Sequence, residues 1–369
     1  MAPENLADER AFIGELVGDR PAEWDVAGEL PVDLLRKMGA KGMLCAEVPQ
    51  AYGGVGVGSR ENGELTAYVG SLCSSLRSIM TSQGIAASTI QRFGDREQRK
   101  RYLAELTGGK LAAVAFSEPE AGSDLAAMQT RIRPDGDEFV LDGEKKWVTG
   151  ARYADLLLVL VRHGDDAAAV VVPTDTPGVH IEPVADPLGC RAAGHSQVRF
   201  DQVRLPVPRV LGGGGQSLSL LFTTALSYGR MSVAWGCVGI LRACLSAATG
   251  HAKRRVQSGK PLAEHQLVAG HLADLLVAER TSAQACEAAS RSWESASPDM
   301  IVAAVLAKHV SAGHAARGAA TAVQVLGSAG SQDGHAVARA YRDAKLMEII
   351  EGSNEICRLI LSQHALESF

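Results

Sequence analysis

The chain changes its hydrophobic periodicity twice, and this change restricts the fold more than any other feature of the sequence. From about residue 4 to 110 apolar residues recur with helical spacing, as in LPVDLLRKMGAKGMLCAEVP. From about 111 short runs of β type follow, such as DLLLVLVRH and AAAVVVPTD. After the glycine-rich stretch VLGGGGQS the helical spacing returns. We therefore expect three units in the order helical, β and helical.

These changes set the expected domain boundaries. We place an N-terminal helical domain at residues 1–110, a middle β-barrel or sandwich domain at 111–213, and a C-terminal domain at 214–369. A length of 369 residues exceeds one ordinary core, which agrees with more than one domain.

Each of the last two domains has a characteristic pattern. In SQVRFDQVRLP the apolar residues Val198, Phe200, Val203 and Leu205 indicate a half-buried strand. The C-terminal domain contains four long helical segments, which predict an antiparallel four-helix bundle. These segments lie near 216–258, 264–293, 299–327 and 335–364.

Charge and composition exclude several classes of function. The net charge is -5 and no long run carries one sign, so neither a nucleic-acid groove nor a polybasic membrane patch is expected. The start of the chain lacks a signal-peptide pattern, and no segment approaches about 18 uninterrupted apolar residues. We expect a cytoplasmic protein that acts on a small or protein-bound substrate.

The cysteines and histidines give no sign of a metal site. Seven cysteines are scattered singly among apolar neighbours without CxxC spacing, as expected for buried thiols in a reducing compartment. The ten histidines form no HExxH pair. We therefore expect no metal.

Two stretches of the middle domain can hold a ligand. In AFSEPEAGSD, residues 115–124, backbone N–H groups and the Ser123 hydroxyl can bind a phosphate or the edge of a heterocycle, although an ordinary β-turn explains the pattern as well. In KKWVTG, Trp147 and Thr149 share one strand face, where an indole can lie over a planar ring.

Two further stretches lie in the C-terminal domain. Arg255 follows a basic helix end in HAKRRVQSGKP. The basic side chains there either complement the helix dipole or bind a phosphate. Gln324 precedes a second glycine-rich loop in VQVLGSAGSQDG. Each of these signals is weak when it is taken alone.

Taken together and in order, the motifs resemble those of the acyl-CoA dehydrogenase family of flavoproteins over nearly the whole chain. The matching phrases are VPQAYGGVGVG, RFGDREQRKRYLAELTGGK, SEPEAGSD, LDGEKKWVTG, HAKRRVQSGKP, AVQVLGSAG and RDAKLMEIIEGSNEICRLIL. The resemblance implies a three-domain fold that holds one FAD between the β domain and the C-terminal bundle. It also implies a homodimer or homotetramer, because the family binds part of its FAD across a subunit interface.

The resemblance also implies a set of cofactor contacts. Residues of the middle domain would contact the flavin ring, with the 122–123 turn at the pyrophosphate or the substrate's pantetheine arm. Residues 255 to 328 would reach the adenine half, and 353–355 the FAD of their own subunit. The implied residues are Phe116, Ser117, Gly122, Ser123, Trp147, Thr149, Arg255, His265, Gln266, Gln324, Gly327, Ser328, Ser353, Asn354 and Glu355.

Glu351 is the implied catalytic base. It follows Ile349 and Ile350 and precedes a break at Gly352, and in the family a carboxylate at this place removes the α-proton of an acyl thioester. Apolar neighbours would raise its pKa and the helix that restarts after it would lower the pKa, so the sequence leaves the net direction open. Without the other motifs, a solvated carboxylate at a helix end explains the residue equally well.

A rival position for the base is empty, since Gly229 stands where some relatives carry a glutamate on the first long helix of the bundle. Arg230 beside it and Gly352 are implied to contact the substrate, together with Ser123; a structural helix cation is an equal explanation for Arg230.

Three serines depart from the family pattern and leave the thioester carrier open. Ser258 and Ser331 replace aromatic residues near the cofactor, and Ser227 replaces an acidic residue near the acyl-carrier arm. The carrier is therefore expected to be either CoA or an acyl carrier protein. The compact, alanine-rich style is similar to relatives in polyketide clusters, which make hydroxymalonyl or methoxymalonyl extender units.

The electron acceptor is likewise open, because the same fold serves flavin monooxygenases and oxidases that use oxygen. The expected acceptor is thus either a protein or oxygen. Some of these relatives lack the glutamate or use aspartate, so Glu351 favours dehydrogenation of an acyl thioester. A DNA-associated relative would need a basic tail, which the sequence lacks.

Overall fold

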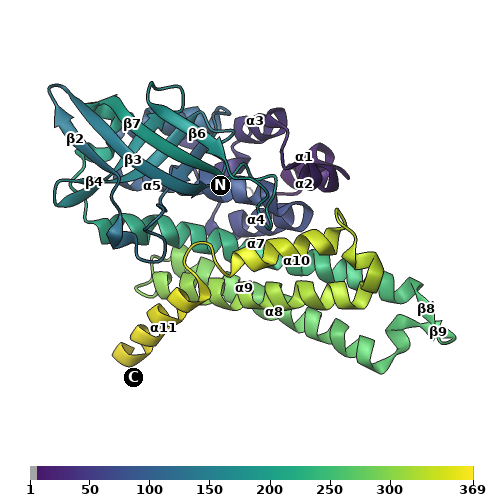
Figure 1. Cartoon of the computed structure of the whole chain (residues 1–369). Helices are drawn as coiled ribbons and strands as arrows, with labels where there is room; N and C mark the ends of the chain where they lie inside the picture. The colour runs from purple at the N-terminus through teal and green to yellow at the C-terminus, as the bar shows by residue number, and fades with distance from the viewer. Residues whose placement is uncertain (1–5, 369) are drawn as a thin grey trace.

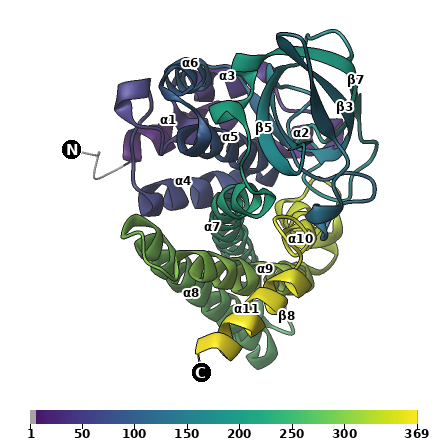
Figure 2. The same ribbon diagram turned by 90° about the vertical axis from the view of Figure 1, so that its left-hand side faces the viewer.

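Three packed units follow one another along the chain in the computed structural model, which describes residues 6–368 (Figure 1). Figures 1 and 2 both show the C-terminal helices below the N-terminal helices and the β domain, which lie side by side. The expected order of helical, β and helical units is confirmed.

The N-terminal unit is helical throughout, apart from short 3-10 turns. The long helix α5 is buried over most of its length and packs on both the middle domain and the bundle. A capping box between Asp95 and Gln98 starts the next helix, α6, and so fixes where α5 ends. The helices are α1 (Ala7–Val17), α2 (Pro21–Ala27), α3 (Val32–Ala40), α4 (Ser59–Leu72), α5 (Ser74–Phe93) and α6 (Arg96–Thr107).

The middle unit is one seven-stranded sheet in the order β1-β4-β2-β3-β7-β6, with β5 paired to β4. Strand β7 buries Val198, Phe200, Val203 and Leu205, as its pattern predicts, and Gln202 with φ +50 lies where the alternation shifts by one residue. The strands are β1 (Ala112–Ala115), β2 (Arg131–Asp135), β3 (Glu138–Val148), β4 (Leu156–His163), β5 (Asp166–Pro173), β6 (Val179–Pro183) and β7 (Ser196–Pro206).

The C-terminal unit is built around one long helix, α7, which packs on α4, α5, α8 and α9. The stretch 212–215, which precedes α7, consists of four glycines with positive φ, as expected for a hinge between units. The elements are α7 (Leu218–Arg254), β8 (Val256–Gln257), β9 (Lys260–Pro261), α8 (Gln266–Glu294), α9 (Met300–Leu326), α10 (Ala336–Met347) and α11 (Asn354–Ser368).

The fourth helix expected in this bundle, 335–364, is two helices. α10 ends at Met347 and α11 begins at Asn354, and the six residues between them form turns. The expected four-helix bundle is therefore a domain with five long segments, and α11 points away from the rest in Figure 1. The interruption that the sequence predicts at Gly352 is confirmed, and only the extent of 335–364 as one helix is wrong.

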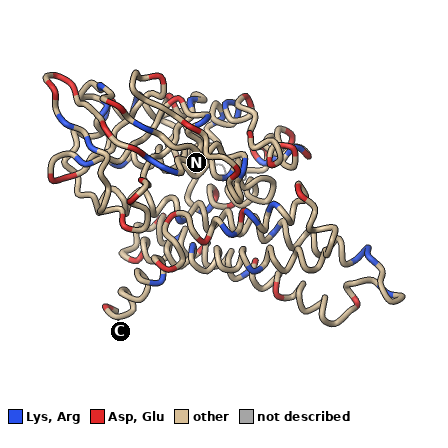
Figure 3. Tube along the Cα trace, in the orientation of Figure 1, with Lys and Arg blue, Asp and Glu red and all other residues tan. Residues whose placement is uncertain are grey.

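Helix α7 is long and apolar enough to cross a membrane by length and composition, with a mean hydropathy of 1.5 over its best window. However, 72% of that window is buried inside the protein. Its apolar residues are thus used as the core of the C-terminal domain. Lys, Arg, Asp and Glu are interspersed along the trace of all three units in Figure 3.

Candidate active site

Glu351 lies in the break between α10 and α11 with a backbone φ of +56, a conformation that non-glycine residues rarely adopt. Two buried cations hold the break. Arg230 Nε donates to the Glu351 carbonyl oxygen at 3.1 Å, and Lys308 Nζ donates to the Gly352 carbonyl oxygen at 2.7 Å. The backbone strain is therefore maintained by tertiary hydrogen bonds, as is typical of functional sites.

The carboxyl group of Glu351 is shielded from water. Its Oε2 atom is buried and has no hydrogen-bond partner among the described residues. Burial raises the pKa of Glu351 to about 7, against the opposing effect of the positive charges of Arg230, Lys308 and Arg77. The sequence left the direction of the pKa shift of Glu351 open, and the structure shows that the pKa is raised. A raised pKa suits a general base at neutral pH.

Glu351 shares a cavity of about 160 Å³ with four other residues that the sequence predicts as ligands of the cofactor. Phe116 and Ser117 enter it from the end of β1, and Trp147 and Thr149 from the end of β3. The structure thus brings together residues from three separate motifs. The other lining residues include Arg77, Ser78, Thr81, Ser82, Ile85, Cys190, His195 and Met347.

A buried ion pair holds the two middle-domain motifs against each other. Lys145 Nζ lies 2.8 Å from Glu118 Oε1 and donates to the Phe116 carbonyl oxygen at 3.0 Å. Glu118 also accepts the backbone N–H groups of Gln129 and Thr130. Both charges are compensated, so the glutamate of SEPEAGSD and the lysine of KKWVTG have a structural role that the sequence did not reveal.

Trp147 is placed so that a planar ligand can stack on its exposed ring. Its φ is +56, its side chain is 56% exposed at the edge of the cavity, and its ring meets that of His195 edge-on at 5.9 Å. Indole and phenyl faces from Trp147 and Phe116, with hydroxyls from Ser117 and Thr149, match the edge and face of a flavin ring. The residues present therefore fit FAD at this cavity.

His195 is a lining residue that the sequence analysis missed. Its Nδ1 lies 3.2 Å from Thr149 Oγ1, and its Nε2 is buried without a partner among residues 6–368. Burial, and then the cation of Arg77, lower the pKa of His195 to about 4, so the ring is neutral at pH 7. A lone histidine directly before a strand gives no signal in a single sequence.

The remaining predicted cofactor residues lie elsewhere in the protomer. Arg255, His265 and Gln266 lie by the β8–β9 turn at the far end of the bundle, where Figure 3 also shows basic residues. Gln324 lies in the last turn of α9, Gly327 and Ser328 follow that helix, and Gly122 and Ser123 form a turn. All of these predicted residues are exposed except His265, which is half-buried with its Nε2 3.1 Å from the Gln257 carbonyl oxygen.

Residues 353–355 begin α11. Asn354 is buried, and its amide donates to Glu348 Oε1 at 3.2 Å while its Oδ1 accepts from Lys308 Nζ at 3.5 Å. Ser353 Oγ accepts the N–H of Ile356 at 3.4 Å, and Glu355 is exposed. Within the protomer these groups stabilise the break that carries Glu351, and their contact with FAD stays a prediction.

Gly229 faces the carboxyl group of Glu351. A β-carbon at position 229 would overlap Oε2 and would lie 2.6 Å from Cδ of Glu351. We expect Gly229→Ala to displace the carboxylate and to lower turnover by about tenfold or more, because small displacements of a catalytic group are costly. FAD content and single-turnover rates check this result.

A matched control for this substitution is Gly270→Ala. Gly270 also lies in a helix, α8, but a β-carbon there meets no atom within 4 Å. This variant is expected to keep its activity and to gain helix propensity. Equal turnover in both variants would contradict the assigned contact between Gly229 and Glu351.

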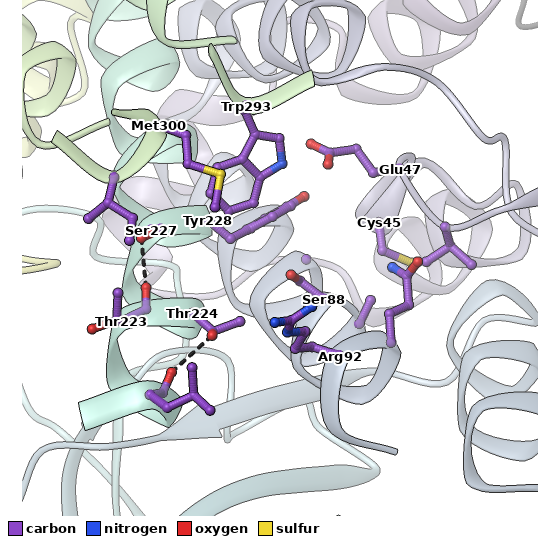
Figure 4. Close-up of a pocket in the computed structure, with 16 residues that line it drawn as sticks. Cys45, Glu47, Ser88, Arg92, Thr223, Thr224, Ser227, Tyr228, Trp293 and Met300 are labelled. Atoms are coloured by element: carbon purple, nitrogen blue, oxygen red, sulfur yellow. Dashed lines mark hydrogen bonds between the residues drawn. The ribbon is translucent and has the colours of Figure 1, made fainter. Parts of the chain in front are cut away.

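A second, larger cavity of about 500 Å³ lies between α5, α7 and the α8–α9 turn (Figure 4). It shares no lining residue with the Glu351 cavity. Glu47 and Tyr228 lie at its inner side, and both accept hydrogen bonds from Asn62, at 2.8 and 3.1 Å. Ser227 and Arg92 also line it. Burial raises the pKa of Glu47 to about 7.

The part of the chain that the structure describes contains no group of three or more His, Cys, Asp or Glu side chains arranged to hold a metal ion. The seven cysteines are free and buried, as their apolar surroundings predict.

Three family models together match most of the chain. The model for the N-terminal domain of acyl-CoA dehydrogenase matches residues 6–110, that for the middle domain 113–203, and that for the C-terminal domain 220–366. The probable acyl-CoA dehydrogenase YngJ of Bacillus subtilis (strain 168) is 34% identical over 378 residues, covering 98% of this chain and 99% of the relative.

Two solved structures have the same fold. FkbI, described as a protein for biosynthesis of the methoxymalonyl extender unit of the Fk520 polyketide, is 62% identical with a TM-score of 0.93, covering 97% of this chain and 99% of FkbI. A glutaryl-CoA dehydrogenase from Mycobacterium smegmatis in complex with FADH2 is 26% identical with a TM-score of 0.92, covering 99% and 95%. The chain therefore belongs to the acyl-CoA dehydrogenase family, whose members are FAD-dependent oxidoreductases that act on acyl thioesters.

Proposed function

We propose that Glu351 is the base with which this enzyme removes the α-proton of a small acyl thioester. The observation that carries the proposal is the buried Oε2 atom without a partner, in the same cavity as Trp147 and Thr149. Burial disfavours the charged form of a carboxylate, so a buried, ionised Glu351 is a stronger base than a carboxylate in water.

The chemistry follows from the substrate class. A thioester carbonyl acidifies the neighbouring C–H bond, and a donor at the carbonyl oxygen stabilises the charge that develops there. The backbone N–H of Glu351 is available for this, since no acceptor among residues 6–368 hydrogen-bonds it. FAD, when bound, supplies the acceptor for the hydride that leaves the β-carbon. Glu351 takes the α-proton, and Arg230 and Lys308 keep its loop in place.

The similarity to FkbI supports a more specific proposal about the substrate. FkbI is 62% identical to this chain over nearly the whole of both chains. We propose that this enzyme oxidises a short acyl group on an acyl carrier protein during formation of a methoxymalonyl-type extender unit.

Anaerobic mixing tests this proposal. The oxidised enzyme is mixed with short acyl thioesters of CoA and of an acyl carrier protein, and the flavin absorbance is followed. Bleaching that depends on Glu351 supports the dehydrogenase, and faster bleaching with the carrier-protein thioester supports the proposed carrier. Turnover that requires both NADH and oxygen would instead favour a flavin monooxygenase. Each candidate electron acceptor, an electron-transfer protein or oxygen, is then added to the reduced enzyme. The acceptor that restores the flavin absorbance is the oxidising partner.

The exposed cofactor residues support an oligomer as the working form. Arg255 and Gln324 lie far from the Glu351 cavity along the bundle, and large apolar side chains are exposed on other helices of the same domain. Leu267 on α8 is 85% exposed, and Leu359 on α11 is 67% exposed. We propose a homodimer or homotetramer in which these faces meet and one subunit's Arg255 binds a phosphate of the FAD held by its partner.

Arg255→Ala tests this arrangement. We expect the variant to retain less FAD and to dissociate at higher protein concentration than the parent, because a charge-assisted bond to phosphate is lost. Flavin content after gel filtration and sedimentation measure the two effects. Arg254→Ala removes a neighbouring exposed cation and serves as the control. Unchanged flavin content in Arg255→Ala would count against the proposal.

A further inference from the structure

We infer that His195 is a positioning residue that turns the hydroxyl hydrogen of Thr149 into the cavity that fits FAD, and thereby raises the reduction potential of the flavin. This role rests on FAD in the Glu351 cavity, and it is independent of Glu351 as the proposed base. It concerns a side chain that none of the family motifs contains.

The backbone at His195 is tied to the turn that directly follows β3. The N–H of Gly150 in that turn donates to the Ala193 carbonyl oxygen at 2.9 Å. On the other side, the His195 carbonyl oxygen accepts the N–H of Val184, also at 2.9 Å. The imidazole therefore stands at a fixed place beside the end of β3, where Thr149 lies.

Thr149 is held both by its backbone and by its side chain. Ser82 Oγ donates to the Thr149 carbonyl oxygen and accepts the N–H of Val114, both at 3.1 Å, which fixes the backbone. The Thr149 hydroxyl lies 3.2 Å from His195 Nδ1, and it has no other hydrogen-bond partner among residues 6–368. Within the protein, the direction of the hydroxyl hydrogen is thus set by the imidazole.

The number of hydrogens on this pair permits two arrangements. The imidazole is neutral, so it has one N–H and one nitrogen that accepts. When Nδ1 carries the hydrogen, it donates to Thr149 Oγ1, and the hydroxyl donates into the cavity. When Nε2 carries the hydrogen, the hydroxyl donates to Nδ1, and the buried N–H at Nε2 is left without an acceptor among the described residues.

Two observations favour the hydrogen on Nδ1. Buried N–H groups without an acceptor are rarer in proteins than acceptors without a donor, and Nε2 of His195 is the nitrogen without a partner. In addition, Arg77 lines the same cavity, and its positive charge acts on the imidazole. A nearby cation disfavours an N–H that has no acceptor of its own, because the hydrogen carries positive partial charge.

With this tautomer, the pair forms a directed chain of hydrogen bonds. Nδ1–H of His195 donates to Oγ1 of Thr149, the hydroxyl donates onward, and each bond polarises the next. The receiving site is the cavity that Phe116 and Trp147 also line, which fits the flavin ring. A donor to a flavin heteroatom stabilises the electron-rich reduced ring more than the oxidised ring. The pair is therefore expected to raise the reduction potential.

A direct contact of Nε2 with the acyl group is the competing role for His195. Such a contact changes the affinity for the substrate and leaves the potential of the substrate-free enzyme where it is. A contribution through Thr149 changes the potential even when no substrate is present. The potential of the substrate-free enzyme therefore separates the two roles.

The test measures the two-electron reduction potential of the FAD-loaded enzyme against a reference dye, without substrate. We expect His195→Phe to lower the ratio of reduced to oxidised flavin about tenfold at a given dye potential, which is about 30 mV for a two-electron couple. Thr149→Val is expected to lower it at least as much. Adding His195→Phe to Thr149→Val should change nothing further, because the histidine acts through the hydroxyl.

Two more substitutions distinguish the ring nitrogens. The side-chain amide of Asn reaches the place of Nδ1, and that of Gln reaches the place of Nε2. His195→Asn is therefore expected to keep most of the parent's potential, and His195→Gln to behave like His195→Phe. His180 is exposed on β6, and His180→Asn is the control that should leave the potential unchanged.

The outcomes that overturn the inference are defined by the same measurements. They are an unchanged potential in His195→Phe, a further loss in the double variant, and equal potentials in His195→Asn and His195→Gln. FAD content and melting temperature show which variants are folded, and the comparison of Asn with Gln decides alone when His195→Phe does not fold. Because no substrate is present, failure of Glu351 as the base would appear only in turnover and would leave these potentials unchanged.

Discussion

Glu351→Gln is expected to keep its FAD and to oxidise acyl thioesters at least about 10³-fold more slowly, since a positioned general base typically contributes 10²- to 10⁴-fold. Glutamine has nearly the same shape as glutamate, so the carbonyl contact of Arg230 with the backbone of residue 351 remains. What is lost is the ability to accept a proton at the atom that faces Gly229. The single-turnover rate of flavin bleaching measures this loss directly.

A stability measurement shows that the variant is folded. The pKa of Glu351 is raised from 4.5 to about 7 by burial, so the folded protein binds this proton more tightly than the unfolded chain does. Stability is therefore lost between about pH 4.5 and 7, where the unfolded chain ionises this group and the folded protein does not, and at pH 8 the FAD-free Gln variant should melt at a higher temperature than the parent. Glu367→Gln in α11 is the control for a lost carboxylate. A rate near that of the parent would refute the assignment.

The second large effect is a dependence of the rate on pH. Only the ionised form of Glu351 accepts a proton, so the single-turnover rate should rise about tenfold per pH unit and level off above the pKa, near 7. At pH 5 the rate is then about 100-fold below its plateau. An ordinary, exposed glutamate would give the same curve with its midpoint near 4.5.

Other groups with shifted pKa values can be separated from this effect. The pKa of His195 is lowered to about 4, below the range of the transition, so its ring stays neutral throughout. Glu47 has a pKa raised to about 7 but lies in the other cavity, and Glu47→Gln should leave the midpoint where it is. A midpoint below about 5.5 in the parent enzyme would show that Glu351 is hydrated when the substrate is bound.

The sequence predicts the architecture well because each unit has its own period. The alternation in 196–206 and the helical spacing around it are local signals, and the structure agrees with them. The last segment shows the limit of this reasoning. The sequence marks a break at Gly352, but it does not show that Arg230 and Lys308 approach from α7 and α9 to hold that break.

The site is predicted only in part, for a similar reason. Glu351, Trp147 and Thr149 stand in motifs, and the structure places them around one cavity. Arg77 and His195 line the same cavity but have ordinary neighbours in the sequence, which do not show that one nitrogen of each side chain is buried without a hydrogen-bond partner among the described residues. Their importance follows from burial and from missing hydrogen bonds, which are tertiary properties.

The contact between Gly229 and Glu351 has a consequence for how enzymes of this shape diversify. One position on α7 and one in the break between α10 and α11 project toward one point, and only one of them can carry a side chain at a time. A lineage could therefore relocate its proton acceptor through an exchange of substitutions at these two positions, but an intermediate with both side chains would be overcrowded and one with neither would be inactive.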